Sequence, residues 1–186
     1  MMFRMFIWIY PLAKMIKILG IDPGTNITGF GLIELSGSKF KYIHHSILKT
    51  GLKNKYTQKL SKINCETERV IAEFKPDHVA IESVFFSVNA ATAIKLGQSR
   101  GAAVCACSRA DLEIFEYSPR RVKMLVTENG SSDKEIVRSA VKKILRIRRS
   151  IEMDASDALA VAISHGRSIL DQEVEIKSVW YKYFIN

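Results

Sequence analysis

The sequence predicts an α/β fold in which a mixed five-stranded sheet is flanked by helices. Three apolar, strand-like segments follow one another near the N-terminus with only short turns between them. Two more short apolar runs come later, each after a stretch of helical periodicity, and the last third of the chain has the periodicity of helices alone. Strands and helices in this order form a sheet that helices cover.

The first three strands are expected to form an antiparallel meander. They are residues 16–21 (IKILGI), 27–35 (ITGFGLIEL) and 39–51 (KFKYIHHSILKTG), and the Asp-Pro-Gly-Thr turn joins the first two. A helix over 56–74, stopped by Pro76, leads to the fourth strand at 78–86. Because a helix separates this strand from the meander, we expect it to pair in parallel.

The second half of the chain is mainly helical. A helix rich in small residues is predicted over 89–108, and a fifth strand over 112–118. The next helix begins at Ser132, which has the capping-box spacing with Glu135. The last clear helix starts at Asp154 and is expected to end at Gly166, because glycine commonly follows a helix C-terminus.

The 186 residues are enough for one sizeable core and short for two. Residues 1–14 are interpreted as an extension outside the fold, because their apolar run is short and interrupted by Pro11, unlike a signal peptide or a membrane span. Met15 stands directly before the first strand and is an alternative start. A single domain is therefore expected over 15–170, with a tail of unassigned role over 171–186.

The chain is basic. Lysine and arginine outnumber the acids 28 to 19, which gives a net charge of +9. A surplus of this size suggests a polyanionic partner, nucleic acid or membrane. The three cysteines include no C-x-x-C pair, and we interpret them as small buried residues of a reducing, cytoplasmic compartment rather than as a disulfide or zinc site.

Four acidic residues lie where apolar segments begin or end. Asp22 closes the first strand, Glu82 interrupts the buried fourth strand, and Asp154 and Asp157 share one face at the head of the last helix. Three of them have an alternative reading: Asp22 as a turn former, Asp154 as an N-cap, and Asp157 as a partner of the helix dipole. Glu82 is different, because a carboxylate inside a buried strand is unfavourable unless it is paired or metal-bound.

If the first and fourth strands are neighbours, the four carboxylates can meet at one edge of the sheet. They would repel one another strongly without divalent cations. Oxygen ligands alone suit Mg²⁺ or Mn²⁺. Two such ions could activate a water molecule and stabilise the leaving oxygen of a phosphodiester.

The chain resembles the RuvC family, the bacterial Holliday junction resolvases, in three segments with the family's order and spacing: GIDPGTNITGFG, AIESVFFSVNAATAIKLGQSRG and DASDALAVAISH. The resemblance covers about residues 15–168. It implies an RNase H-like fold and a magnesium-dependent endonuclease that acts as a homodimer. Such an enzyme nicks two opposed strands of a four-way DNA junction symmetrically, in homologous recombination and DNA repair.

Carried over residue by residue, the resemblance makes Asp22, Glu82, Asp154 and Asp157 the catalytic, metal-binding carboxylates. It also implies the branch-migration complex of RuvA and RuvB as a partner. A carboxylate on the tip of a rigid strand then has a reason, because metal ligands need a fixed geometry.

The helix that begins at Ser132 has a basic residue at every fourth position: Lys134, Arg138, Lys142 and Arg146. Like charges at this spacing weaken a helix, so a DNA backbone explains the stripe better than stability does, and a solvated face is the alternative. The resemblance matches Lys134 to a family lysine near the scissile phosphate and Lys123 to another. The segment RIRRSIEM before Asp154 is unusually basic and could strengthen backbone binding.

Phe85 and Phe86 directly follow the strand that carries Glu82. One of them can pack in the core, and the other could stack on an unpaired or distorted base, a contact worth about 1–3 kcal/mol. The resemblance favours Phe85 for stacking, whereas the residues themselves leave both open.

The helix over 89–108 has small residues at four-residue steps, Ala93, Gly97 and Gly101. Such a face lets another element approach closely. That element is either the sheet of the same chain or, as the resemblance implies, the twin helix of a second subunit, which would suit a junction with near two-fold symmetry.

Two other functions fit part of the pattern. Actin and Hsp70-like ATPases also use an I-D-x-G-T turn, but they need a second phosphate loop and a second lobe, and this chain has no second D-x-G-T. A non-catalytic junction-binding module would satisfy the basic stripe, yet it would leave Glu82 and the Asp154–Asp157 pair without a purpose.

Overall fold

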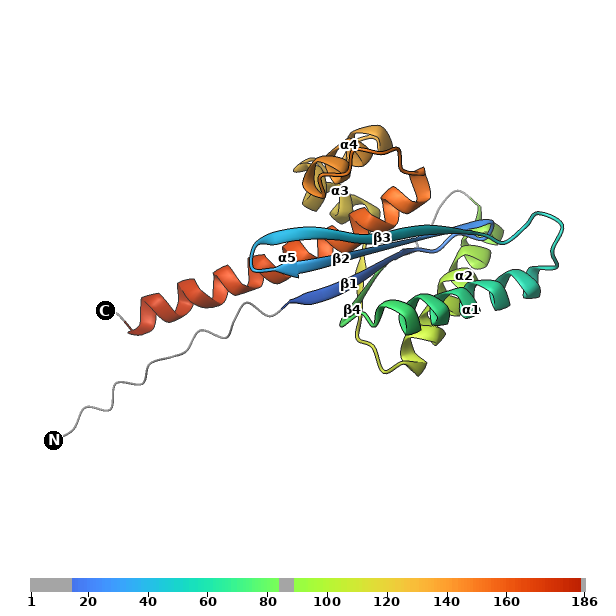
Figure 1. The fold of residues 1–186 in the computed structure, drawn as a ribbon, viewed down its shortest axis with the longest axis horizontal. Coiled ribbons are helices and arrows are strands. Elements are labelled where there is room, and N and C mark those ends of the chain that lie inside the picture. The colour runs from blue at the N-terminus through green and yellow to red at the C-terminus, as the bar shows by residue number, and fades with distance from the viewer. Residues whose placement is uncertain (1–14, 84–88, 185–186) are drawn as a thin grey trace.

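The computed structural model describes residues 15–83 and 89–184, with 173–184 as helix backbone only. Five strands form one sheet in the order β3-β2-β1-β4-β5, and helices lie on both of its faces (Figure 1). The strands are β1 (Ile16–Asp22), β2 (Ile27–Ser36), β3 (Lys39–Lys49), β4 (His78–Glu82) and β5 (Ile114–Tyr117). The helices are α1 (Tyr56–Phe74), α2 (Ala90–Arg109), α3 (Pro119–Thr127), α4 (Lys134–Ile144) and α5 (Met153–Phe184).

The predicted strand pairing is confirmed. β1 pairs antiparallel with β2, and β2 pairs antiparallel with β3, with a register shift between Leu32 and Ile33. β4 pairs in parallel with β1 on one side and with β5 on the other. The α1 and α2 segments supply the long crossovers that parallel strands require.

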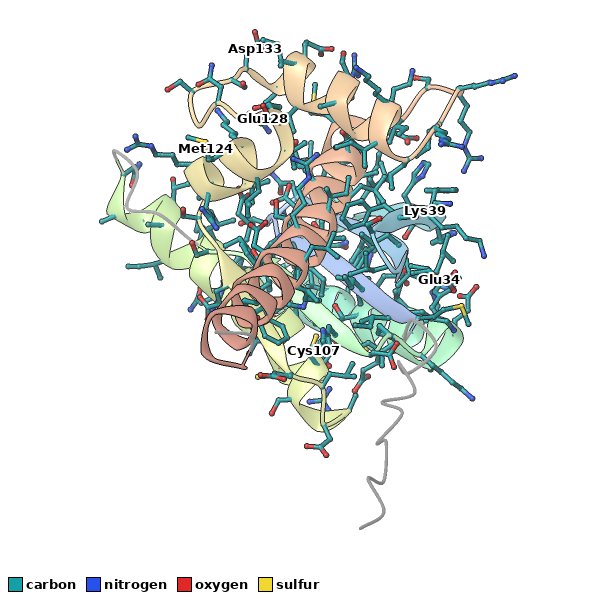
Figure 2. All side chains as sticks on the ribbon, turned by 90° about the vertical axis from the view of Figure 1, so that its left-hand side faces the viewer. Glu34, Lys39, Cys107, Met124, Glu128 and Asp133 are labelled. Carbon is teal, nitrogen blue, oxygen red and sulfur yellow. The ribbon has the colours of Figure 1, made fainter. Side chains whose placement is uncertain are left out.

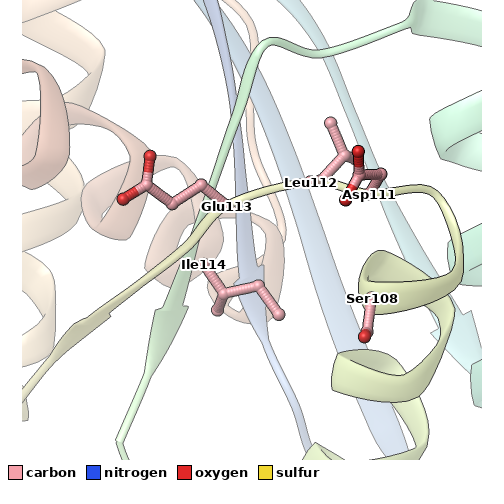
Figure 3. A pocket seen from close by; sticks show the side chains of 5 residues that line it. All are labelled: Ser108, Asp111, Leu112, Glu113 and Ile114. Carbon is pink, nitrogen blue, oxygen red and sulfur yellow. The ribbon is translucent and has the colours of Figure 1, made fainter.

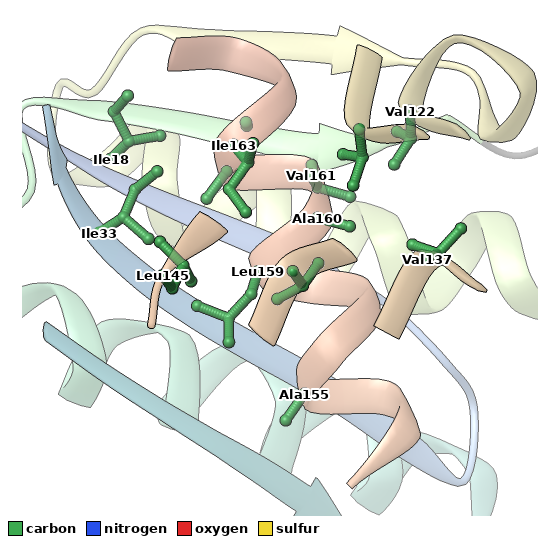
Figure 4. Packing of buried hydrophobic residues seen from close by; sticks show 14 of the residues in the cluster. Ile18, Ile33, Val122, Val137, Leu145, Ala155, Leu159, Ala160, Val161 and Ile163 are labelled. Atoms are coloured by element: carbon green, nitrogen blue, oxygen red, sulfur yellow. The ribbon is translucent and has the colours of Figure 1, made fainter. Parts of the chain in front are cut away.

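Each face of the sheet has its own hydrophobic core, because side chains alternate along every strand. Leu19, Ile21, Phe30 and Leu32 pack against α1 and α2. Ile18 and Ile33 point to the opposite face and pack under α4 and α5, where Leu145, Leu159 and Ile163 meet them (Figure 4). This second core fixes α5 across the sheet. Figure 2 shows that α3 and α4 lie side by side; Met124 and Glu128 mark α3, and Asp133 marks the start of α4.

Glycines in β1 and β2 let α5 approach the sheet closely. A Cβ atom on Gly20 would lie 2.0 Å from the backbone oxygen of Ala158, and one on Gly29 would lie 2.0 Å from that of Asp154. Any side chain at these positions would push the helix away from the sheet. The start of α5 is therefore held directly above the strand pair β1–β2.

The expected end of the last helix at Gly166 is wrong. α5 continues to Phe184, through most of the segment expected as a tail. Gly166 is buried, and a Cβ there would lie 2.4 Å from Cε1 of Phe40, so this glycine serves close packing inside a helix. It is not among the glycines with positive φ, which a C-terminal cap would require.

Other local predictions also need correction. α4 is capped by Asp133, whose carboxylate accepts a hydrogen bond from the Ile136 amide, while the hydroxyl of Ser132 bonds to that of Thr127 instead. The helix α3 was not recognised, although Ser118 and a proline at its first turn mark its start. The fourth strand ends at Glu82, and Phe85 and Phe86 lie outside the described residues.

Only one of the three cysteines is buried. Cys107 lies on the buried face of α2, where burial raises the pKa of its thiol to about 12, whereas Cys65 and Cys105 are exposed. Within the described residues, none of the helices is long and apolar enough to cross a membrane.

Candidate active site

Asp22 and Glu82 lie side by side at one edge of the sheet. The parallel register of β1 and β4 pairs Ile21 with Ile81, and the two acids are the next residue of each strand. Both side chains are partly buried. Neighbouring parallel strands thus bring together two acids that are sixty residues apart in the sequence.

The start of α5 brings the remaining two acids to this edge. Asp154 lies in the first turn of the helix, and its backbone oxygen sits directly above Gly29, the register partner of Asp22. Asp157 is close enough for its charge to act on both Asp22 and Glu82. An acid in the first turn of a helix also interacts favourably with the helix dipole.

Burial and neighbouring carboxylates disfavour the charged forms of Asp22 and Glu82. The pKa of Asp22 is raised well above its usual value, first by burial, and then by the charges of Glu82 and Asp157 and by a hydrogen bond with Glu82. Burial also raises the pKa of Glu82, although the bond from Asp22 opposes this rise. Both carboxyl groups therefore give up their protons less readily than ordinary acids, and burial is the first cause for each.

Two lysines approach the acids from the helices that cover this face. The ammonium group of Lys134, at the start of α4, donates to Oδ2 of Asp157 at 2.7 Å. The bond with Asp157 raises the pKa of Lys134. Lys123 of α3 also lowers the pKa of Glu82 through its charge. The site is thus an acidic centre with a cationic border.

The donor set at this edge fits a hard divalent cation. It consists of carboxylate oxygens, which Mg²⁺ and Mn²⁺ prefer. Burial is the first cause of the raised pKa values of Asp22 and Glu82, and the charge of Lys134 opposes the rise in both. In the part of the chain that is described, no three acid, histidine or cysteine side chains form a ready-made metal cluster.

The predicted basic stripe is only partly present. Lys134 points to the acids, Arg138 forms an ion pair with Glu135 at 2.5 Å, and Lys142 is half-buried on α4. The placement of Arg146 on this helix is wrong, because α4 ends at Ile144 and Arg146 has a φ of +55° in the following loop. A continuous helical stripe therefore does not exist.

The small-residue face of α2 is free of the chain's own described residues. No atom lies within 4 Å of a Cβ placed on Gly97 or on Gly101, apart from the local helix backbone. Ala93 is half-buried on this helix, and Ile94 is 63% exposed. Packing against the chain's own sheet, one of the two alternatives, does not account for these two glycines.

One residue at this edge was missed from the sequence. Lys59 is buried in α1 and donates to Oδ1 of Asn26 at 2.7 Å, which fastens the turn that follows Asp22. The sequence carries a signal for this contact, because Lys59 has the helical spacing of the buried residues Ile63 and Val70 of α1. A lysine in such a series indicates a buried polar contact.

A shallow hollow of about 340 Å³ lies at the other end of the sheet (Figure 3). Its lining comes from the end of α2 and the start of β5: Ser108, Asp111, Leu112, Glu113 and Ile114. The parallel direction of β4 and β5 separates it from Glu82. It is therefore distinct from the acidic edge.

The fold and this edge define a class of protein. A five-stranded mixed sheet with its first three strands antiparallel, flanked by helices, is the RNase H-like fold, and the acids of β1, β4 and the start of α5 lie at one edge of its sheet. The chain belongs to the RuvC family: the family model "Crossover junction endodeoxyribonuclease RuvC" matches residues 18–165.

Curated relatives and solved structures agree with this assignment. The chain is 42% identical over 168 residues to the crossover junction endodeoxyribonuclease RuvC of Mannheimia succiniciproducens, covering 90% of this chain and 82% of the relative. It is 41% identical over 158 residues to that of Geobacter sulfurreducens, covering 85% and 96%. The structure of Thermus thermophilus RuvC in complex with Holliday junction substrate matches with a TM-score of 0.78 at 29% identity, covering 83% of this chain and 94% of that one.

Proposed function

We propose that this protein is a structure-specific endonuclease that resolves four-way (Holliday) DNA junctions, in homologous recombination and DNA repair. One observation carries the proposal: in a chain of the RuvC family, Asp22, Glu82 and Asp157 meet at one sheet edge with too little positive charge to balance them. The cut is a metal-dependent hydrolysis of one phosphodiester in each of two opposed strands.

Asp22, Glu82, Asp154 and Asp157 are the residues that would hold the metal, two Mg²⁺ ions per site, with Mn²⁺ as a substitute. When bound, these ions supply an activated water and stabilise the leaving oxygen. The chain contributes a rigid cradle, because two ligands end paired strands and two begin a helix fixed by close glycine contacts. Lys134 and Lys123 would counter the negative charge that develops on the phosphate.

The same proposal covers the remaining contacts with DNA. Arg138, Lys142 and Arg146 would contact phosphates. Phe85 or Phe86 would stack on a base beside the acids. These roles rest on the family and on the position of each residue in the sequence.

Symmetric nicking requires two active sites related by a two-fold axis. The exposed small-residue face of α2, with Ala93, Gly97 and Gly101, supports a homodimer through the twin helix of a second copy. The RuvA/RuvB branch-migration complex is the proposed partner that delivers the junction.

The test uses the purified chain, a synthetic four-way junction and a matched duplex, each with Mg²⁺ or with a chelator. We expect paired, symmetric nicks in the junction only, and only with Mg²⁺. Asp22→Asn and Glu82→Gln should bind the junction without nicking it. Asp111→Asn and Glu113→Gln make the same chemical changes at the other end of the sheet, and they should nick normally.

Binding without nicking by the wild-type chain, on junctions of varied sequence, would instead support a non-catalytic junction-binding module. Equal nicking of duplex and junction would contradict structure specificity. Asymmetric cleavage of a single strand would contradict the two-fold arrangement.

A further inference from the structure

The loop between α4 and α5, residues 145–152, is a second basic surface beside the acidic edge. Its apolar residues face inward, with Leu145 and Ile151 buried in the core that also holds α5. Its three arginines, Arg146, Arg148 and Arg149, are all exposed. The buried apolar side chains anchor the loop in the core, and the arginines form a positively charged outer surface.

Arg149 fastens the loop to the edge strand β3. Its guanidinium donates to the hydroxyl of Tyr42 at 2.6 Å and lies 5.7 Å from the centre of that ring. The Tyr42 hydroxyl is also 2.9 Å from Nδ1 of His45, and Nε2 of His45 is 3.9 Å from Glu152. Arg149 is therefore bonded to β3, and Glu152 lies close to the same strand.

Arg146 and Arg148 have no such partner. Within the described residues, neither forms an ion pair or a side-chain hydrogen bond. Arg146 also has a φ of +55° directly after the helix, a backbone conformation that glycine or asparagine adopts at a lower free-energy cost. Two unpaired like charges, one of them on a strained backbone, are unfavourable in the free protein and favourable beside a polyanion.

We propose that Arg146 and Arg148 bind the phosphodiester backbone of a DNA arm of the junction, and that Arg149 is a positioning residue that holds the loop against Tyr42. This inference rests on the proposed function and names a substrate contact outside the acidic edge. It adds Arg148 to the phosphate contact already proposed for Arg146, and it places both on a loop that leads directly into α5.

The length of the connecting chain limits where on the arm this contact falls. Arg148 precedes Asp154 by six residues, which span at most about 21 Å when extended. Since each base pair of a duplex rises about 3.4 Å, this span corresponds to about six base pairs for Arg148, and the eight residues from Arg146 to Asp154 correspond to about eight.

The first experiment measures junction affinity between 50 mM and 200 mM salt for the wild-type chain and for the double variant Arg146→Asn, Arg148→Gln. Each lost phosphate contact lowers the salt slope by about 0.9, so the affinity ratio of wild type to variant should shrink by about tenfold over this range. Asparagine tolerates the positive φ, so the variant should keep its fold. Lys75→Gln, an exposed lysine at the end of α1 on the other face of the sheet, should leave the slope unchanged.

The second experiment places neutral methylphosphonate linkages one at a time along the arms. Wild type should lose affinity at one or two linkages within about eight base pairs of the cut, and the double variant should be indifferent to them. If the wild-type chain nicks junctions, and the double variant has the same salt slope and the same linkage profile as wild type, the inference is overturned. An equal loss of heparin binding without any linkage effect would also overturn it, because the loop would then be a general polyanion surface.

Tyr42→Phe tests the role of Arg149 separately, since it removes one hydroxyl and no charge. We expect junction affinity to fall a few-fold with the salt slope preserved. An affinity equal to wild type would overturn the positioning role of Arg149. Failure of the wild-type chain to nick any junction would reject the proposed function instead, which keeps the two outcomes distinct.

Discussion

Two polar clusters lie between β4 and α5, one at each end of the strand. At the start of β4, Nδ1 of His78 is 2.9 Å from Nε2 of His165, whose Nδ1 is 2.8 Å from the hydroxyl of Tyr117, and the ring of Phe115 stacks on His165 at 4.0 Å. Both nitrogens of His165 thus have a partner within the chain. At the end of β4, Glu82 meets acids instead.

The difference lies in where the compensating group comes from. The imidazole cluster is complete within the chain, so its groups contribute to packing and stability. At the acidic edge the pKa values of Asp22 and Glu82 stay raised, although the charge of Lys134 lowers both and that of Lys123 lowers the pKa of Glu82. A buried cluster that lacks its counter-charge is a candidate functional site, because something outside the chain must complete it.

The largest expected effect is that of Asp22→Asn. Nicking should fall by about a thousandfold or more, because removing a ligand from such a site forfeits about 4 kcal/mol of transition-state stabilisation. The same change should raise the melting temperature of the metal-free protein, because a buried carboxylate that its neighbours repel becomes a neutral amide. Calorimetry in chelator measures this, and a lower melting temperature would show that the acidic cluster is a stabilising network.

The pH dependence of stability should have opposite signs at the two clusters. Burial lowers the pKa of His165 to about 4, so between pH 6.5 and 4 the unfolded chain binds a proton that the folded chain does not. Stability therefore falls as the pH falls through this window, by about 3 kcal/mol. Asp22 and Glu82 have raised pKa values, so their contribution is present at low pH and is lost as the pH rises through those values.

Urea unfolding in chelator separates the two contributions. In an Asp22→Asn background the loss of stability toward pH 4 should remain, and it should shrink in Asp22→Asn combined with His165→Phe. A pH profile that is the same with and without His165 would show that this histidine is not the titrating group.

Glycine variants compare the two ends of the helix contact. Gly29→Ala would press on the backbone of Asp154, and Gly20→Ala on that of Ala158. Both should lower stability by about 1–3 kcal/mol. Gly29→Ala should in addition slow nicking by up to about a hundredfold, since it displaces a ligand by a fraction of an ångström to an ångström. Equal nicking rates of the two variants, measured at matched folded fraction, would contradict a special role for the start of α5.

The smallest expected effect concerns the ammonium group that stands among the acids. Lys134→Met should tighten Mn²⁺ binding without DNA by about two- to fivefold, because an exposed ion pair with Asp157 is worth up to about 1 kcal/mol. Lys143→Met, an exposed lysine near the other end of the same helix, is the matched control and should bind Mn²⁺ as wild type does. Titration calorimetry gives both constants, and weaker binding by Lys134→Met would show that this lysine supports the metal ligands.

Much of the fold was predictable from the sequence because its strands and helices have strong local signals. Strand β1 is a continuous apolar run, and α1 matches its predicted bounds because Pro76 limits where it can end. The predictions failed where a local signal had a tertiary purpose. Gly166 packs against Phe40 inside a helix, and Arg146 leaves the helix that its spacing predicted.

The sequence by itself determined the order of the five strands and of the helices other than α3, and it singled out the four acids, because residue type and periodicity are properties of the chain. Only the tertiary structure decided which groups meet. The parallel register of β1 and β4 places Asp22 beside Glu82, and close contact at Gly29 sets the height of Asp154. Residues far apart in the chain come together through packing and strand pairing. These contacts decide which charges face one another, and so they distinguish the acidic edge from the imidazole cluster.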